Sequence, residues 1–169
     1  MRDKSYNSPR IIDLWRFKSA KTNRVYIVEL EHFAQNLQAI KFYPKDFRHS
    51  PHKYELLTND YEPRKIVFSC FEIMRRILEK DKTVSFAFVA ASDIEESKKA
   101  RGYNRRFRLY RALVTQYFGY DTFAQIHDSN NRVYLMLNNN MIANGKLSVG
   151  ELIDNINEIF EGEFNFSWD

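Results

Sequence analysis

The fold class follows from one nearly continuous apolar run and its neighbours: Thr83-Val84-Ser85-Phe86-Ala87-Phe88-Val89-Ala90-Ala91. Small, β-branched and aromatic side chains without charges are typical of a strand that is covered on both faces. The sequence therefore predicts a central strand here, and the segments on either side of it are expected to supply the rest of a sheet and its helices.

The segment before this strand predicts a helix. Apolar side chains recur at steps of three and four over residues 66–78, which is the period of one buried helical face. Asn59 or Asp60 is expected to cap the helix, and Pro63 suits its first turn. Cys70 falls in the apolar stripe, so we interpret it as a small core residue rather than a nucleophile.

Further upstream, three segments have strand composition, and a fourth, shorter one is expected at the sheet edge. They are rich in β-branched and aromatic residues and are separated by polar turns. A polar tail is expected before them. The strands are predicted over residues 11–17, 24–30, 37–43 and 54–57, and the tail over residues 1–9.

Downstream, a second helix is predicted over residues 104–118 and is expected to stop at Gly119. A β-hairpin follows over residues 122–137, and Ser148-Val149-Gly150-Glu151 is a capping-box pattern that opens a third helix. The strictly alternating tail, residues 164–168, is typical of an added edge strand. Strands interleaved with single helices indicate one α+β domain over residues 1–169: a mainly antiparallel sheet with about three helices packed on one side.

Composition excludes several classes of protein. The chain has 169 residues and a single cysteine, so an internal disulfide and a four-cysteine zinc site are both ruled out. The polar N-terminus lacks the apolar stretch of a signal peptide, and no apolar run approaches the roughly 20 residues that a membrane helix needs. We therefore expect a cytoplasmic protein without membrane partners.

The net charge of +4 is unevenly distributed. Residues 1–92 carry a net charge of +6, residues 93–111 carry +4, and residues 112–169 carry −6. Between Lys98 and Arg111 there are seven basic residues and no acidic one. This run leads into the second predicted helix, whose N-terminus already carries a partial positive charge that disfavours bases.

A bound anion would offset that repulsion, because the first backbone N–H groups of a helix point outward toward such a ligand. The alternative is that the acidic residues Asp93, Glu95 and Glu96 fold back and neutralise the run. The anion hypothesis predicts a binding site for nucleic acid or another polyanion, formed by Arg101, Tyr103, Arg105, Arg106, Arg108 and Arg111.

Nucleic-acid binding would also use exposed aromatic rings, because base stacking on a ring tolerates any sequence. Tyr103, Trp15, Tyr26 and Tyr43 are the candidates. Aromatic residues on strands more often belong to a core, so we expect most of these four to be buried.

Two other functions stay open. The acidic and aromatic tail, residues 158–169, suits a protein-interaction module or a homodimer. An enzyme ranks third, because the common phosphate-binding, zinc-protease and hydrolase motifs are absent from the sequence. Asp46, His49 and His52 are spaced like metal ligands, but Pro51 and nearby bases oppose a site. Asp81, Glu96 and Lys98 resemble a nuclease pattern, and here the second carboxylate lies in a polar loop. We expect no cofactor, metal or catalytic residue.

The segments Tyr103–Arg111 and Arg132–Asn138 resemble an uncharacterised family of small Bacteroidetes proteins. That resemblance implies no activity. The layout of several strands before the first helix is also similar to the PUR and Whirly single-strand-binding domains, in architecture only.

Overall fold

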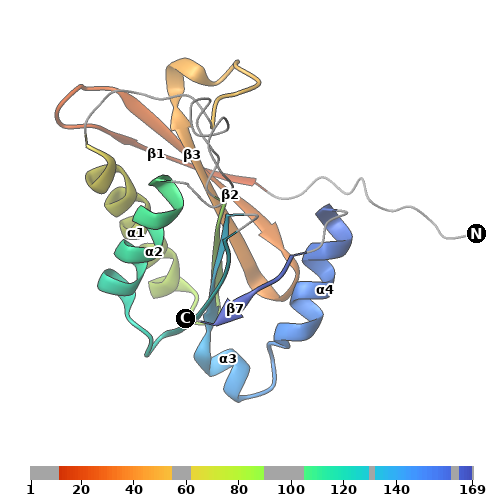
Figure 1. The fold of residues 1–169 in the computed structure, drawn as a ribbon. Helices are drawn as coiled ribbons and strands as arrows, with labels where there is room; N and C mark the ends of the chain where they lie inside the picture. The colour runs from red at the N-terminus through yellow and green to blue at the C-terminus, as the bar shows by residue number, and fades with distance from the viewer. Residues whose placement is uncertain (1–11, 55–61, 90–104, 130–131, 161–163, 169) are drawn as a thin grey trace, which may run out of the picture.

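The computed structural model of the protein describes residues 12–54, 62–89, 105–129, 132–160 and 164–168. Its centre is one seven-stranded sheet with the strand order β1-β2-β3-β4-β6-β5-β7. All neighbouring strands in this sheet are antiparallel except β3 and β4. The predicted α+β class is confirmed, and Figure 1 shows the sheet between helices.

The first half of the sheet is an antiparallel meander. It consists of β1 (Ile12–Lys18), β2 (Val25–Phe33) and β3 (Leu37–Pro44), which lie within one or a few residues of the predicted strands. The turn from β1 to β2 contains Asn23, whose φ of 57° suits the left-handed conformation that asparagine tolerates. A 3₁₀ turn, η1 (Ala34–Asn36), joins β2 to β3, and another, η2 (Lys45–Phe47), follows β3.

Helix α1 (Pro63–Lys80) connects β3 to its parallel neighbour β4 (Ser85–Val89). Helix α2 (Arg105–Phe118) leads to the hairpin of β5 (Phe123–Asp128) and β6 (Val133–Asn138). Gly119 ends α2 with a φ of 64°, as predicted.

One face of the sheet, which we call the two-helix face, packs against α1 and α2. Its core includes Phe71 and Cys70 of α1, Phe86 and Phe88 of β4, and Tyr110 of α2. The helices turn their apolar stripes inward, so this face is closed by aromatic side chains. The predicted place of Cys70 in the core is confirmed, because its side chain is fully buried.

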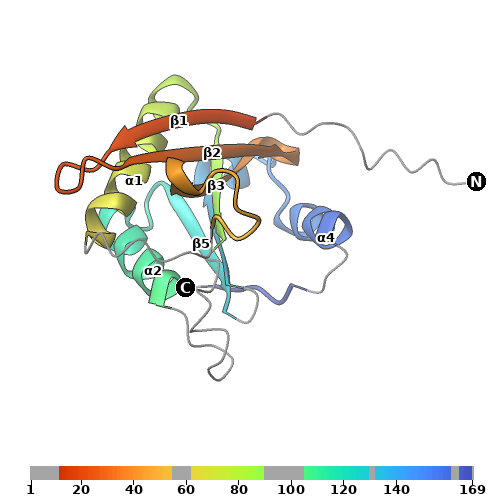
Figure 2. The ribbon, with the colours of Figure 1, turned by 90° about the horizontal axis from the view of Figure 1, so that it is seen from above.

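The opposite face, the α4 face, is covered by α4 (Val149–Phe160), after the short α3 (Asn139–Ala143). Figure 2 shows α4 on one side of the sheet and α1 and α2 on the other. The prediction that all helices pack on one side was therefore wrong. An amphipathic pattern tells which face of a helix is buried, but not which face of the sheet it meets.

Two side-chain contacts fix where α4 begins. Gln35, in the left-handed conformation at a φ of 55°, accepts a hydrogen bond from the backbone N–H of Ser148 at 2.8 Å. Its amide nitrogen donates in turn to the Ser148 carbonyl at 3.3 Å. The predicted cap is present as well, because the Glu151 N–H donates to Ser148 Oγ. The η1 turn thus holds the start of α4 beside the turn that joins the end of β2 to the start of β3.

Several boundaries differ from the sequence prediction. The N-cap residue of α1 is Glu62, whereas Asn59, Asp60 and residues 55–57 lie outside the described residues. The tail forms only a two-residue strand, β7 (Ser167–Trp168), on the edge of β5. Over the described part of the chain, no helix has the length and apolar character needed to cross a bilayer.

Candidate functional site

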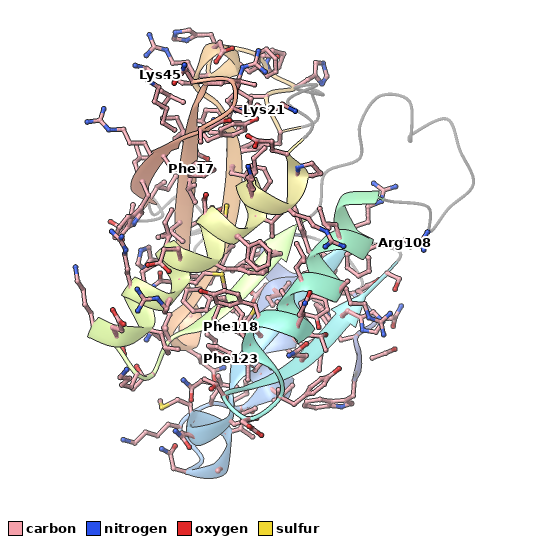
Figure 3. All side chains as sticks on the ribbon, turned by 90° about the vertical axis from the view of Figure 1, so that its left-hand side faces the viewer. Phe17, Lys21, Lys45, Arg108, Phe118 and Phe123 are labelled. Atoms are coloured by element: carbon pink, nitrogen blue, oxygen red, sulfur yellow. The ribbon has the colours of Figure 1, made fainter. Side chains whose placement is uncertain are left out.

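The described part of α2 keeps its basic and apolar residues on different sides. Phe107 and Tyr110 are 6% and 4% exposed and pack on the sheet. Arg108 and Arg111 are exposed, and Figure 3 shows Arg108 near the start of the helix. The first turn contains no acidic residue.

The other residues of the predicted site lie partly inside and partly outside the described residues. Arg105 and Arg106 occupy the first turn of α2. Arg101 and Tyr103 lie outside the described residues, as do the acidic residues that were expected to neutralise the run, at positions 93, 95 and 96. The prediction of an anion site at this helix start therefore stays a prediction.

A second group of basic residues lies at the end of the molecule where the β1–β2 turn, η2 and the start of α1 meet. Ser19 Oγ donates a hydrogen bond to Glu62 Oε2 at 2.9 Å and so ties the turn to the N-cap of α1. Arg24 Nε lies 3.0 Å from Asp46 Oδ2, and its guanidinium sits over the ring of Phe47 at 5.6 Å. These contacts join three segments that are far apart in the sequence.

We call this region the basic end and define it as residues 18–24, 45–53 and 62–65. It contains eight basic and two acidic residues. Both acidic side chains are engaged, Asp46 with Arg24 and Glu62 with Lys65 and Ser19. The exposed basic side chains are those of Lys18, Lys21, Lys45, Arg48, Arg64 and Lys65.

Figures 1 and 3 show that α1 and α2 start at the same end of the molecule and run in roughly the same direction. Their N-termini therefore both point toward the upper part of the molecule in Figure 3, where Lys21 and Lys45 are labelled. Neither helix has an acidic residue in its first turn, although acids are the residues favoured there. Arg64 and Lys65 instead occupy the first turn of α1.

A partly buried carboxylate, that of Glu29, holds residues 53–54 against the sheet. Glu29 of β2 accepts hydrogen bonds from Tyr43 Oη at 2.9 Å, from Lys53 Nζ at 3.1 Å and from the Tyr54 hydroxyl. Lys53 Nζ also lies over the Tyr43 ring at 4.1 Å. This cluster, which we call the Glu29 cluster, fixes residues 53–54 on the α4 face.

The cluster shifts the pKa of each member. Burial alone would raise the pKa of Glu29, but the two tyrosine hydroxyls and the Lys53 ammonium outweigh it and hold that pKa below its usual value. Burial and the donated hydrogen bond to Glu29 raise the pKa values of Tyr43 and Tyr54 to about 12. Glu29 is therefore ionised, and both tyrosines are protonated, at neutral pH.

The basic end was not predicted from the sequence, although the net positive charge of residues 1–92 was noted. The excess of bases in residues 1–92 was visible, and the turn over residues 18–24 contains three bases and no acid. Their convergence with Lys45 and Arg64 depends on strand pairing and on the Ser19–Glu62 hydrogen bond, which no local pattern reveals.

The residues considered as catalytic or metal-binding candidates do not form such a site within the described part of the chain. Among the described residues, no group of three histidine, cysteine or acidic side chains could hold a metal ion. His49 Nε2 receives a hydrogen bond from Arg48 Nε at 2.8 Å. Asp81 accepts from Asn36 and Thr83, while Glu96 and Lys98 of the nuclease-like pattern lie outside the described residues. Burial raises the pKa of the Cys70 thiol, which disfavours the reactive thiolate.

The candidates for base stacking are largely buried. Tyr26 and Tyr43 are 1% and 6% exposed, Trp15 is half-buried, and Tyr103 lies outside the described residues. Phe47 and Tyr54, which the sequence did not single out, are partly exposed beside basic residues of the basic end.

No protein-family model matches this chain, and no curated protein or solved structure is significantly similar to it. The resemblance to a Bacteroidetes family therefore stays an expectation.

Proposed function

We propose that this protein is a non-enzymatic domain that binds nucleic acid through its phosphates. The observation that carries the proposal is the gathering of exposed basic side chains from three distant segments beside the N-termini of α1 and α2. A phosphate backbone would pass over the basic end and continue along the start of α2.

The electrostatics of both helix starts support this function. Each begins with basic residues and without an acid in the first turn, which is unfavourable beside the positive end of a helix. At α1 the N-cap carboxylate of Glu62 offsets part of this cost, and it is already bonded to Lys65 and Ser19. Phosphate oxygens would accept hydrogen bonds from arginine and from unbonded backbone N–H groups at the helix starts. Neutralising several phosphates releases counterions, so the affinity is expected to fall steeply with salt.

Stacking adds a second contribution at the basic end and at Tyr54 beside it. Phe47 lies beneath Arg24, and Tyr54 lies near Lys41 and Lys53 at 5.9 Å and 4.9 Å. Partly exposed rings between cations suit unpaired bases, because stacking tolerates any base. We therefore propose single-stranded DNA or RNA as the ligand.

The test is the fluorescence anisotropy of labelled single-stranded DNA and RNA, titrated with the protein over a series of salt concentrations. Two triple variants remove equal charge from the two halves of the surface: Lys21→Ala, Lys45→Ala and Arg48→Ala, and separately Arg105→Ala, Arg108→Ala and Arg111→Ala. Each should weaken binding and reduce the slope of log affinity against log salt by about 2, the value for three phosphate contacts on a single strand.

A matched control separates a local surface from net charge. Lys80, Lys82 and Lys146 are exposed at or beyond the C-terminal end of α1 and after α3, away from the basic end. Their triple alanine variant has the same net charge as the test variants and should keep the wild-type slope. Equal losses in all three variants, or no binding by the wild type at low salt, would contradict the proposal.

A second candidate function is supported by Trp168. Its side chain is 63% exposed on β7, a two-residue strand at the edge of the sheet. Such a residue suits a protein-interaction module or a homodimer. Deleting residues 163–169 would then change the oligomeric state in sedimentation experiments without altering the salt dependence of DNA binding.

A further inference from the structure

A hollow of about 230 Å³ lies between the α4 face of the sheet and α4 itself. Its walls come from four strands, from α4 through Ile156, and from Phe164 after that helix. Apart from Glu31 and Lys41, the described residues that line it are all apolar. Neither the basic end nor α2 contributes to it. Of the residues named for nucleic-acid binding, Lys41, which lies near the Tyr54 ring, also lines the hollow.

Two alanines create the space. Ala39 of β3 and Ala87 of β4 are direct partners across the parallel strand pair, and each is 4% exposed. The neighbours of Ala87 along β4 are Phe86 and Phe88, which point to the closed two-helix face. On the α4 face the two central strands therefore present methyl groups, and α4 does not come close enough to fill the gap.

The wall that contains Phe164 is held in place. The backbone N–H of Phe164 donates to Asn157 Oδ1 on α4 at 2.8 Å, and the next N–H, of Asn165, donates to Asp128 Oδ2 on β5 at 2.7 Å. Asp128 is 2% exposed, so this anchor is buried. Together with the Gln35–Ser148 hydrogen bonds, these contacts keep both ends of α4 at a fixed position over the hollow.

The charges in the lining balance one another. Lys41 Nζ lies 2.9 Å from Glu31 Oε2, and the two side chains are 30% and 11% exposed. An ammonium has three donors and a carboxylate about four acceptor positions, so the pair can bond to one another and also to a ligand. The attraction and repulsion that an ion would meet from this neutral pair largely cancel, and moving the ion from water into the apolar lining is costly, so the site favours an uncharged polar group.

We propose that this hollow is a binding site for a small uncharged aromatic compound that carries one hydrogen-bonding group. The apolar walls and the rings of Phe33 and Phe164 would enclose its body, and the Glu31–Lys41 pair would bond its polar group. An apolar cavity of about 150 Å³ holds a benzene molecule, so the larger hollow suits a fused two-ring compound of the size of indole.

The test uses indole as the probe on the full chain, with ¹⁵N-labelled protein observed by NMR and the affinity measured by calorimetry. Indole should produce saturable shifts at backbone amides around Ala39, Ala87 and Phe164. Indole should bind about fivefold more tightly than 1-methylindole, which lacks the N–H donor. The charged indole-3-acetate should bind more weakly than indole.

Variants that fill the hollow decide whether it is the site. Ala39→Val with Ala87→Val should abolish the indole shifts, and Ile156→Phe fills the same space from α4 if the strand changes disturb folding. Ala124→Val is the matched control, because Ala124 lies on β5 of the same face and does not line the hollow. It should bind indole like the wild type.

The Glu31→Leu/Lys41→Met double variant tests the polar group and should remove the preference for indole over 1-methylindole. Three results would overturn the proposal. These are no saturable shift up to the solubility limit of indole, wild-type binding in the filled variants, or shifts centred on the two-helix face.

Discussion

The two faces of the sheet are built from the same strands but differ in how tightly their side chains pack. Along β4, Phe86 and Phe88 point to the two-helix face, and Ala87 between them points to the α4 face. On the first face Phe71 packs against the rings of Phe88 and Phe118 at centroid distances of 5.8 Å and 5.3 Å. On the second, two opposed alanines border a hollow.

This difference means that one face contributes most of the stability and the other face provides space for a ligand. Close packing gives each buried atom its full set of dispersion contacts, whereas atoms beside a hollow lack partners on one side. We therefore expect the two-helix face to dominate the free energy of unfolding, and the α4 face to tolerate changes in side-chain volume. Two helices cover the two-helix face, whereas α4 and the Glu29 cluster cover the α4 face.

The largest expected effect concerns truncation on the closed face. Phe71→Ala should lower the free energy of unfolding by about 4 kcal/mol, because it removes a fully buried ring and leaves a cavity. Ile156→Ala, on α4 beside the hollow, should cost about 2 kcal/mol, at the low end for such a truncation. Urea denaturation measures both, and equal losses would contradict the comparison.

The next effect concerns the Glu29 cluster. Glu29→Gln should cost about 2 kcal/mol, because the side chain is 14% exposed and its charge accepts three hydrogen bonds. Because folding lowers the pKa of Glu29, its contribution is fully present above about pH 4.3, the usual value for glutamate, and is lost as the pH falls through the lower folded-state value. Urea denaturation over a pH series should show a flatter acid limb for the variant.

Enlarging a side chain should have a smaller effect, with a sign that differs between the two faces. Cys70→Leu overfills the closed face and should cost about 1–3 kcal/mol. Ala87→Val on the other face of the sheet should be neutral or stabilising by up to about 1 kcal/mol, because space is available beside it. Thermal denaturation of the two variants measures this contrast, and a destabilised Ala87→Val protein would mean that the α4 face is as tightly packed as its counterpart.

The smallest effect concerns the attachment of α4. Gln35→Ala removes both hydrogen bonds to Ser148 and should cost about 1 kcal/mol. Amide hydrogen exchange should become faster in α4 and stay unchanged in α1, because the two helices lie on different faces of the sheet. Faster exchange in both helices would show that the faces do not open independently.

Elements with a clear period were predictable from the sequence. The strands of the meander, α1, α2 and the β5–β6 hairpin were all expected near their observed bounds, because alternation and 3–4 residue steps are local signals. Helix α3, with five residues, is too short to show a period. The side of the sheet that α4 covers depends on the Gln35–Ser148 contact across 113 residues, which no local pattern contains.

The candidate sites also divide into one that follows from a local pattern and others that depend on long-range contacts. The separation of Arg108 and Arg111 from Phe107 and Tyr110 follows from helical spacing and was expected. The basic end requires three strands to pair, and the hollow requires Ala39 to lie opposite Ala87. Both are consequences of register, which side-chain pattern constrains only when one face is polar.

Cys70 is a natural chemical probe for the opening of the two-helix face. It is the chain's single cysteine, its side chain has no exposed surface, and burial keeps its thiol protonated. A thiol reagent can therefore label the native protein only during the brief intervals when α1 lifts from the sheet. At a reagent concentration high enough for labelling to outpace reclosing, the labelling rate equals the opening rate of the two-helix face. No engineered probe is needed, because the chain has no second thiol.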